Sequence, residues 1–245
     1  MSSDERLPAS TPRLFVDQPL GLGAAIVLPT PASHFLATVM RLNPGDAVRL
    51  FDDRTGEWLG RVDGGTRKAL GIRIEAQLGV RETVPDLWLC AAPLKRGRID
   101  WVAEKACELG VARLVPVLTA RTVVDKLNLD RLRAHMIEAA EQCGRTALPE
   151  MSETLTLAAL LRDWPADRTL IFADETGGAP FTEAARPGPT AILIGPEGGF
   201  TPAERDAVRA VQGSIGVSLG PRILRADTAA AVSVGLWQAL AGDWN

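Results

Sequence analysis

Two glycine-containing segments near the carboxyl end of the chain are the strongest candidates for ligand chemistry. Ile194–Phe200 reads Ile-Gly-Pro-Glu-Gly-Gly-Phe, and Leu219–Ala229 combines Gly220 with Arg222 and Arg225 among aliphatic residues. Glycine carries no Cβ, so the backbone of such a segment can approach a bound molecule closely. Aliphatic residues in a neighbouring loop can also cover a flat ring such as adenine. A pair of binding loops is the favoured interpretation, and two tight turns built from the same residue types are the alternative.

Charged residues form two further groups. Lys95–Arg98 holds three basic residues just after an apolar run. Within Glu138–Arg145, acidic, amide and basic side chains recur at the i, i+3 or i+4, i+7 spacing of one helical face. Such groups could bind phosphates, a substrate or a partner. A solvated polar surface is the ordinary alternative.

The elements that must position these residues follow from the apolar pattern beyond about Leu87. Near-continuous apolar runs alternate there with helical segments, which is typical of a parallel sheet covered on both faces. We expect strands over 87–92, 113–118, 169–173, 191–194 and 214–219. Ligands bind such sheets at the carboxyl ends of the strands. Both glycine-containing segments and Lys95–Arg98 directly follow expected strands, so one site could gather all three.

Helical patterns fill the intervals between these strands. Thr201–Glu204 is a strong helix start, because the hydroxyl can cap the helix, proline suits its first position and glutamate can return a hydrogen bond. Glycines at the ends of apolar stripes mark helix stops. We expect helices over 99–110, 132–144 and 201–213, and a last one from Asp227 or Thr228 to Leu240.

The first part of the chain has a different pattern. Between residues 13 and 84, short alternating apolar runs are separated by Pro- and Gly-containing turns at 43–46, 52–56 and 63–65, which predicts a small β-barrel. One helix interrupts it, with Ser33 as its expected N-cap. Residues 1–12 read as a polar tail. The expected organisation is therefore a tail over 1–12, a barrel over 13–84 and an α/β domain over 85–245.

Composition excludes several classes of protein. The chain is 46% hydrophobic with a net charge of -3, which suits a folded cytoplasmic protein and argues against extended disorder. No apolar run reaches the length of a membrane helix, and the start lacks the pattern of a signal peptide. Three cysteines, Cys90, Cys107 and Cys143, form no metal-binding or disulfide pattern and are expected to be buried reduced thiols.

Several common chemistries lack their residues. Gly216–Gly220 matches the G-x-S-x-G nucleophile pattern, but His34 and His135 both precede Ser218, whereas such hydrolases place the histidine later. With two histidines and no metal-binding motif, no metal site is expected. The chain also lacks a phosphate-binding P-loop motif.

Taken together, these blocks resemble the RsmE family, methyltransferases that modify N3 of one uridine in 16S ribosomal RNA. The matching segments run nearly end to end: 13–15, 34–46, 95–98, 104–111, 138–145, 194–200 and 219–229. The resemblance implies an N-terminal PUA-like small β-barrel that helps to bind RNA. It further implies a C-terminal SPOUT domain with a largely parallel sheet and a trefoil knot, a homodimer, and S-adenosylmethionine as methyl donor.

The resemblance also implies roles for individual residues. The expected cofactor pocket comprises Gly195, Glu197, Gly198, Gly199, Leu219, Gly220, Ile223, Leu224 and Arg225. Independently of the resemblance, the chemistry and the loop positions make Arg225 and Arg145 the candidates to stabilise the developing charge on the base, and Glu141 or Glu197 the candidate to accept the N3 proton. RNA contacts are expected from Arg13, Arg41, Lys95, Arg96 and Arg98. Where the family pattern has Glu before Thr this chain has Asp227, which we expect to cap a helix rather than to act directly.

Two other classes of function compete with this interpretation. A non-catalytic RNA-binding ribosome assembly factor would use the barrel and the basic loops without any affinity for the cofactor. A conventional Rossmann-type methyltransferase would place its glycine-rich loop after the first strand, whereas here the glycine segments come late in the chain. That order favours the knotted class.

Overall fold

The computed structural model describes residues 7–8, 10–124 and 126–244, which form two compact units. The described residues up to Thr83, together with Gly144–Ala147, make the first unit. Val84–Cys143 and Leu148–Asn245 make the second, of which Asp125 and Asn245 are outside the described residues. Most of the tail expected over 1–12 also lies outside them.

The first unit is built on a five-stranded sheet with the order β1-β3-β4-β5-β2. The strands are β1 (Arg13–Phe15), β2 (Ala25–Val27), β3 (Ala47–Phe51), β4 (Glu57–Thr66) and β5 (Ala69–Gly79). β1 pairs with β3 in parallel, and the other pairs are antiparallel. Alternate residues of these strands, such as Val48, Leu50, Ile72 and Ile74, meet in one apolar core.

Two sequence predictions fail within this unit. The helix α1 (Thr30–His34) starts three residues before the expected cap and continues as a π-helical turn, η1 (Phe35–Val39). Ser33 is a buried helix residue, whose hydroxyl donates to the Leu28 carbonyl and accepts from the Leu70 amide, both at 2.9 Å. The turn expected at Asp63–Gly65 is a continuation of β4, because Gly64 and Gly65 pair across to Gly71 and Leu70.

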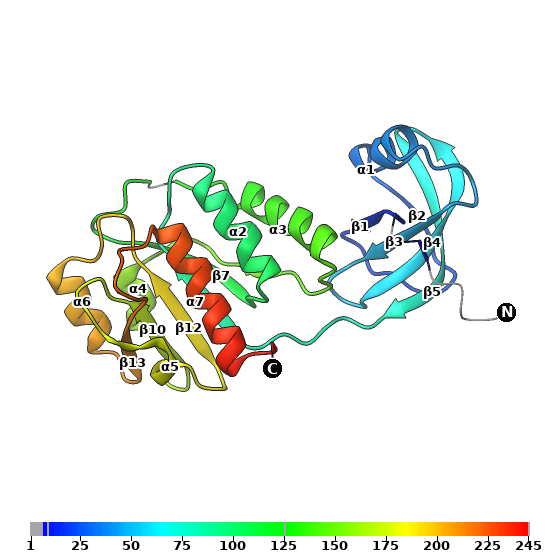
Figure 1. Ribbon diagram of the computed structural model, residues 1–245. Helices are drawn as coiled ribbons and strands as arrows, with labels where there is room; N and C mark the ends of the chain where they lie inside the picture. The colour runs from blue at the N-terminus through cyan, green and yellow to red at the C-terminus, as the bar shows by residue number, and fades with distance from the viewer. Residues whose placement is uncertain (1–6, 9, 125, 245) are drawn as a thin grey trace. The chain divides into compact units, whose positions relative to one another are not determined.

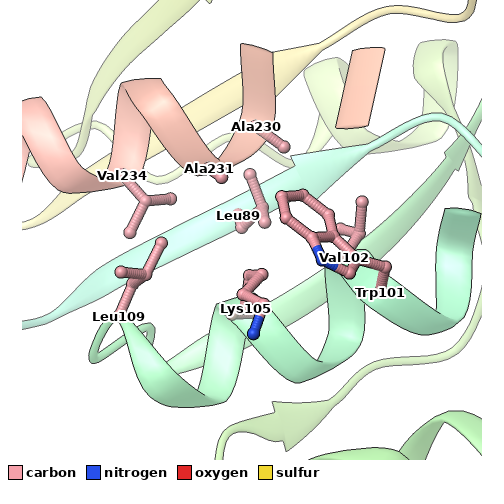
Figure 2. Close-up of a pocket in the computed structure, with 9 residues that line it drawn as sticks. Leu89, Trp101, Val102, Lys105, Leu109, Ala230, Ala231 and Val234 are labelled. Carbon is pink, nitrogen blue, oxygen red and sulfur yellow. The ribbon is translucent and has the colours of Figure 1, made fainter. Parts of the chain in front are cut away.

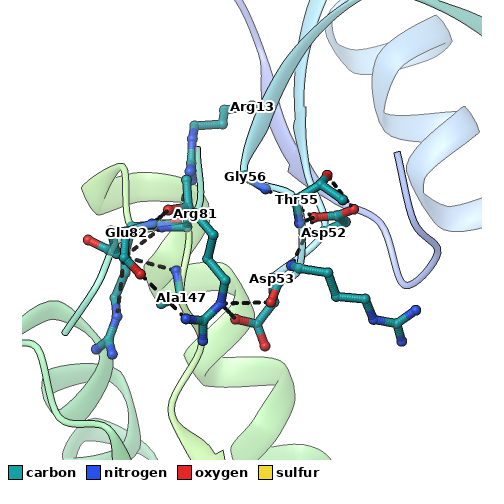
Figure 3. A network of polar contacts seen from close by, with 11 residues as sticks. Arg13, Asp52, Asp53, Thr55, Gly56, Arg81, Glu82 and Ala147 are labelled. Atoms are coloured by element: carbon teal, nitrogen blue, oxygen red, sulfur yellow. Dashed lines mark hydrogen bonds and ion pairs between the residues drawn. The ribbon is translucent and has the colours of Figure 1, made fainter. Parts of the chain in front are cut away.

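Polar contacts hold Gly144–Ala147 to the first unit (Figure 3). The Glu82 Oε1 atom accepts from the amides of Thr146 and Ala147, at 2.8 and 2.9 Å. Nearby, one Asp52 oxygen accepts from the backbone of the β3–β4 turn, including Thr55 N at 2.7 Å. Burial alone raises the pKa of Asp52, but the hydrogen bonds from Thr55, Leu20 and Arg54 outweigh it and lower that pKa.

The second unit is a mostly parallel sheet with the order β11-β13-β10-β12-β6-β7-β8, with β9 added beside β7. Its main strands are β6 (Leu87–Ala91), β7 (Arg113–Leu118), β10 (Thr169–Ala173), β12 (Thr190–Ile194) and β13 (Ser214–Ser218). These confirm the five expected strands, within a residue at each end. The short β8 (Glu150–Met151), β9 (Leu155–Thr156) and β11 (Ala179–Pro180) have no counterpart in the sequence prediction.

Helices cover both faces of this sheet (Figure 1). α2 (Arg98–Glu108) packs against α3 (Leu129–Cys143) and α7 (Ala226–Ala241), and α7 lies against β12 and β6. On the other face, Cys90, Phe172 and Leu193 form a core with Leu160 and Val208 from α4 (Leu157–Arg162) and α6 (Pro202–Arg209). The short α5 (Phe181–Ala184) touches α7. Side chains on both faces of each main strand are therefore buried, which explains the unbroken apolar runs in the sequence.

The helix boundaries correct three further predictions. α6 stops at Arg209, before the expected glycine at 213, where the chain turns with a φ of 78°. α7 begins at Ala226, with Arg225 at its N-cap position. Asp227 is therefore in the first turn of the helix and does not cap it. No helix among the described residues is long and apolar enough to cross a membrane. The trefoil knot stays a prediction.

Candidate functional site at the carboxyl edge of the sheet

The first glycine-containing segment connects β12 to α6. Gly199 N donates to the Pro196 carbonyl at 2.9 Å and closes a tight turn, with Gly199 at a φ of 64°. Thr201 and Glu204 then form the expected reciprocal cap of α6. A buried strand on one side and a capped helix on the other therefore fix the ends of this loop.

Two glycines of this loop have side chains close to the position that a Cβ would take. A Cβ on Gly195 would lie 3.0 Å from the Phe200 ring, which is buried against Phe172. A Cβ on Gly199 would lie 2.4 Å from Glu175 Oε1. The loop thus combines a left-handed turn with the close approach of side chains from below it, and both conditions favour glycine.

The second glycine-containing segment connects β13 to α7. Gly220 has a φ of 103°, and nothing lies within 4 Å of the position that its Cβ would take. Ile223 is 90% exposed, Leu224 is half-buried and Arg225 is exposed. No acidic side chain of the described residues pairs with Arg225. This loop therefore presents bare backbone, two aliphatic side chains and a cation to solvent.

The two loops flank the end of β10, because β12 and β13 are the neighbours of β10 in the sheet. Asp174, directly after β10, has a fully buried side chain that accepts from Thr176 Oγ1 at 2.7 Å and from Arg209 Nη2 at 2.6 Å. Burial acts to raise the pKa of Asp174, but these hydrogen bonds and the arginine charge lower it overall. Arg205 joins Asp174 to Glu175, the residue against Gly199. This network anchors the floor of the site.

Arg98 connects three of the segments that the sequence singled out. Its Nη1 atom lies 3.1 Å from Glu197 Oε1, and its Nε atom lies 3.8 Å from Asp227 Oδ2. The first residue of α2 thus holds the β12–α6 loop and the first turn of α7 together. The structure gives Arg98 two carboxylate partners, while Lys95 and Arg96 beside it are exposed.

One part of the site has no counterpart in the sequence prediction. The loop after β7 reaches the β12–α6 loop, where Arg121 Nη1 donates to the Gly198 carbonyl at 2.6 Å. The Ala120 amide donates to Glu204 Oε1 at 2.6 Å. Because 77 residues separate Arg121 from Gly198, no local pattern could have revealed this contact.

The remaining predicted residues lie away from this edge or in the first unit. α3 ends at Cys143, and Gly144 takes a φ of 88°, so Arg145 is not on the helical face expected to carry it with Glu138 and Glu141. Arg145 is buried in the first unit, with its Nε atom 3.6 Å from Glu82 Oε1. Glu141 is half-buried on α3.

Two of the expected RNA contacts also belong to the first unit. The Arg13 side chain is buried, pairs with Glu57 at 2.6 Å, stacks 3.9 Å from the Phe51 ring centre and donates to the Arg145 carbonyl at 2.8 Å. These contacts favour a structural role for Arg13. Arg41 is exposed, with a φ of 56°.

The thiol prediction is correct for two cysteines and wrong for the third. Cys90 and Cys107 are buried, and Cys143 is exposed at the end of α3. Burial raises the pKa of Cys90 to about 12, so this thiol is not a nucleophile at neutral pH. No group of three or more His, Cys, Asp or Glu among the described residues could hold a metal ion.

A shallow apolar depression lies between α2 and α7. Figure 2 shows Trp101 and Lys105 of α2 and Val234 of α7 around a shallow depression. Large apolar side chains on the same helices are partly exposed, Trp101 to 38%, Leu236 to 37% and Leu240 to 43%. Large apolar side chains exposed on neighbouring helices are a feature of interaction sites.

Comparison with known proteins identifies the family. A family model described as an RNA methyltransferase domain matches residues 81–238, and one described as an RNA methyltransferase PUA domain matches residues 28–75. Ribosomal RNA small subunit methyltransferase E of Synechocystis sp. is 30% identical over 93% of this chain and 77% of its own length. The chain belongs to the ribosomal RNA small subunit methyltransferase E family.

Solved structures support this assignment over nearly the whole chain. The family member from Neisseria gonorrhoeae, bound to S-adenosyl methionine, is 26% identical with a TM-score of 0.88 and covers 96% of this chain and 100% of its own. A methyltransferase from Legionella pneumophila, in complex with the cofactor SAM, is 29% identical with a TM-score of 0.85, over 95% and 99% of the two chains. The fold is therefore the expected one: a PUA-like domain followed by an α/β domain of the SPOUT class.

Proposed function

We propose that this protein transfers a methyl group from S-adenosylmethionine to N3 of one uridine in the 16S ribosomal RNA of the small subunit. One observation carries the proposal: two neighbouring loops, each with a left-handed glycine, face the same edge of the sheet in a chain of the ribosomal RNA small subunit methyltransferase E family. Relatives solved with the cofactor bound match nearly the whole chain.

The residues present fit this cofactor. S-adenosylmethionine has a flat adenine, a ribose and a charged sulfonium chain, and it needs apolar cover together with backbone donors and acceptors. The open space above Gly220 gives access to bare backbone, and the exposed Ile223 beside it offers an aliphatic cover for a ring. We assign the pocket to the predicted residues Gly195, Glu197, Gly198, Gly199, Leu219, Gly220, Ile223, Leu224 and Arg225.

Methyl transfer to the uridine requires the loss of a proton and the stabilisation of negative charge on the base. When bound, the cofactor supplies an electrophilic methyl group. N3 of uracil is protonated at neutral pH, so a proton must leave and the developing negative charge must be stabilised. Arg225 is the best-placed cation, because it is exposed at the start of α7 without an acidic partner among the described residues.

Glu197 is the first of two candidates to accept the N3 proton. Glu197 lies in the β12–α6 loop, with one oxygen held by Arg98, so that carboxylate is fixed in position. Glu141 is the other candidate acceptor, and Arg145 the other candidate cation.

Arg225→Ala should reduce the rate of methyl transfer more than it reduces cofactor affinity. Methylation by this variant at the wild-type rate would remove Arg225 from the catalytic assignment.

The proposal includes a homodimer and a cytoplasmic site of action. The exposed apolar side chains of α2 and α7, with Trp101 and Leu236 among them, provide a surface that a second copy can cover. The proposed substrate, the small ribosomal subunit, is a cytoplasmic particle. A Leu236→Glu variant that sediments as a monomer, while the wild type sediments as a dimer, would support this surface.

The decisive experiment is methyl transfer with a defined product. Purified protein and isotope-labelled S-adenosylmethionine are incubated with small subunits from a strain that lacks this enzyme, and the digested nucleosides are identified by mass spectrometry. We expect one labelled 3-methyluridine per small subunit. Binding of the subunit without cofactor affinity or label would instead favour the non-catalytic assembly factor.

A further inference from the structure

A second depression lies at the same edge of the sheet as the cofactor loops. Of its lining residues, the sequence indicated only Arg96, as an RNA contact, and the comparisons assign none of them. It is an open groove of about 350 Å³ within the second unit. Two connections line it, the one after β6 and the one after β7, together with the starts of α2 and α3. The lining residues are Leu94, Arg96, Ile99, Val124, Lys126, Leu127, Asn128 and Arg131.

The lining combines apolar and cationic side chains. Leu94 and Ile99 are each 2% exposed and form a floor, and Val124 and Leu127 are half-buried. Arg96, Lys126 and Arg131 supply three cations, and none of the described lining residues is acidic. Arg131 is paired with Asp100 at 2.5 Å, whereas Arg96 and Lys126 are exposed. The described lining residues therefore contribute positive charge, although the whole chain is slightly acidic.

The groove shares both of its connections with the cofactor loops. The connection after β7 contacts the β12–α6 loop through Arg121 and lines the groove through Val124, Lys126 and Leu127. The connection after β6 lines the groove through Leu94 and Arg96 and leads into Arg98, which holds Glu197. The groove and the β12–α6 loop are therefore neighbours at one carboxyl edge.

We propose that this groove receives a single-stranded segment of the substrate RNA, with one nucleotide base against the apolar floor and the adjoining phosphates against Arg96 and Lys126. This inference rests on the proposed function, because it places the acceptor strand beside the donor site. A base paired within a helix hides its N3 edge, so the enzyme needs an unpaired strand. Sites for such strands combine a cationic track with side chains that contact base faces.

The volume and the charge agree with this occupant. The groove is at the small end of the range of sites that enclose small ligands, which is enough for one base and its sugar. A protein partner with an acidic surface would meet the same charge, but it would not use a recess of this size beneath two cations. The flexible side chains of Arg96 and Lys126 at the rim suit phosphates, which fix position without reading sequence.

The test uses the double variant Arg96→Gln/Lys126→Gln in the full-length protein. Its control is Arg186→Gln, an exposed cation that precedes β12 at the opposite edge of the sheet. Affinity for small subunits lacking the methyl group is measured at several salt concentrations, and affinity for S-adenosylhomocysteine is measured by calorimetry. Thermal unfolding confirms that all variants are folded.

We expect the double variant to bind small subunits roughly tenfold or more weakly. The slope of log affinity against log salt should fall by about 1.4, the value for two phosphate contacts to a single strand. Affinity for S-adenosylhomocysteine should be unchanged, and Arg186→Gln should behave as wild type.

Two results would overturn the groove assignment. Unchanged subunit affinity and salt slope in the double variant would show that RNA does not bind in the groove, even if the wild type methylates normally. Loss of S-adenosylhomocysteine binding in the double variant would show that the groove is part of the cofactor site. If the wild type itself neither binds S-adenosylhomocysteine nor transfers methyl groups, the proposed function fails instead, whatever the salt slope shows.

Discussion

Substitution of Gly199 by alanine tests whether the β12–α6 loop must hold its left-handed turn to bind the cofactor. Gly199 has a φ of 64°, a conformation that costs a residue with a Cβ about 1–2 kcal/mol. The new methyl group would also lie 2.4 Å from Glu175 Oε1, so the Glu175 side chain must move away from Arg205. If the loop relaxes in the free protein and must be strained again for binding, affinity for the cofactor falls about 5- to 30-fold.

A matched control separates strain from function. Gly213 has a φ of 78°, with nothing within 4 Å of its Cβ position, and it precedes β13 at the opposite edge of the sheet. Gly213→Ala therefore carries a similar backbone cost without touching the cofactor loops. Both variants should melt about 2–8 °C below wild type.

Calorimetric titration with S-adenosylhomocysteine distinguishes the two variants. We expect the control to bind as wild type and Gly199→Ala to bind more weakly by the factor above. Wild-type affinity in Gly199→Ala would refute the reasoning, because the loop would then not need its left-handed turn for binding. Equal losses of affinity in both variants would show that global stability, rather than the loop, sets the affinity.

Three further predictions concern the surroundings of the site. Arg98→Ala releases Glu197 and Asp227 and should weaken S-adenosylhomocysteine binding about 2- to 5-fold by titration, whereas Arg162→Ala, which breaks a surface pair with Asp163, should not. Asp174 has a lowered pKa in the folded state, so its contribution to stability is complete above an unfolded pKa of about 3.9 and is lost as the pH falls through the folded value. Urea unfolding should show Asp174→Asn to be less stable than wild type at pH 7, with the difference shrinking below about pH 4, and a constant difference would contradict this assignment. Iodoacetamide should modify the exposed Cys143 in the native protein and reach Cys90 and Cys107 only after unfolding, as peptide mass spectrometry would show.

The parallel sheet could be predicted because its signal is local. Each main strand is buried on both faces, so its apolar run is continuous and its ends are marked by turn residues. The cap at Thr201 was equally readable, since the hydroxyl and Glu204 are three residues apart. The same locality placed both glycine-containing loops directly after β12 and β13.

Other features depended on partners far along the chain. Ser33 looks like a helix cap, yet its hydroxyl bridges Leu28 and Leu70 inside the first unit. Gly64 and Gly65 look like a turn, but pairing with β5 extends β4 through them. In each case a tertiary hydrogen bond overrides the local preference of the residue.

In the candidate site, too, local features could be predicted and contacts between distant residues could not. The sequence indicated the backbone loops, because glycine at a ligand site leaves a local mark. It did not indicate that Arg98 binds Glu197 and Asp227, or that Arg121 contacts Gly198, because these pairs form only when four connections meet at one edge. The helical spacing over Glu138–Arg145 placed Arg145 on the face of α3, but α3 ends at Cys143, two residues before Arg145.

Amide hydrogen exchange with and without S-adenosylhomocysteine tests the central claim most directly. If the two glycine-containing loops hold the donor, added S-adenosylhomocysteine should slow exchange in peptides covering 195–199 and 219–225 and leave the first unit unchanged. Protection confined to other segments, or none at saturating ligand, would contradict the assignment of these loops as the cofactor site.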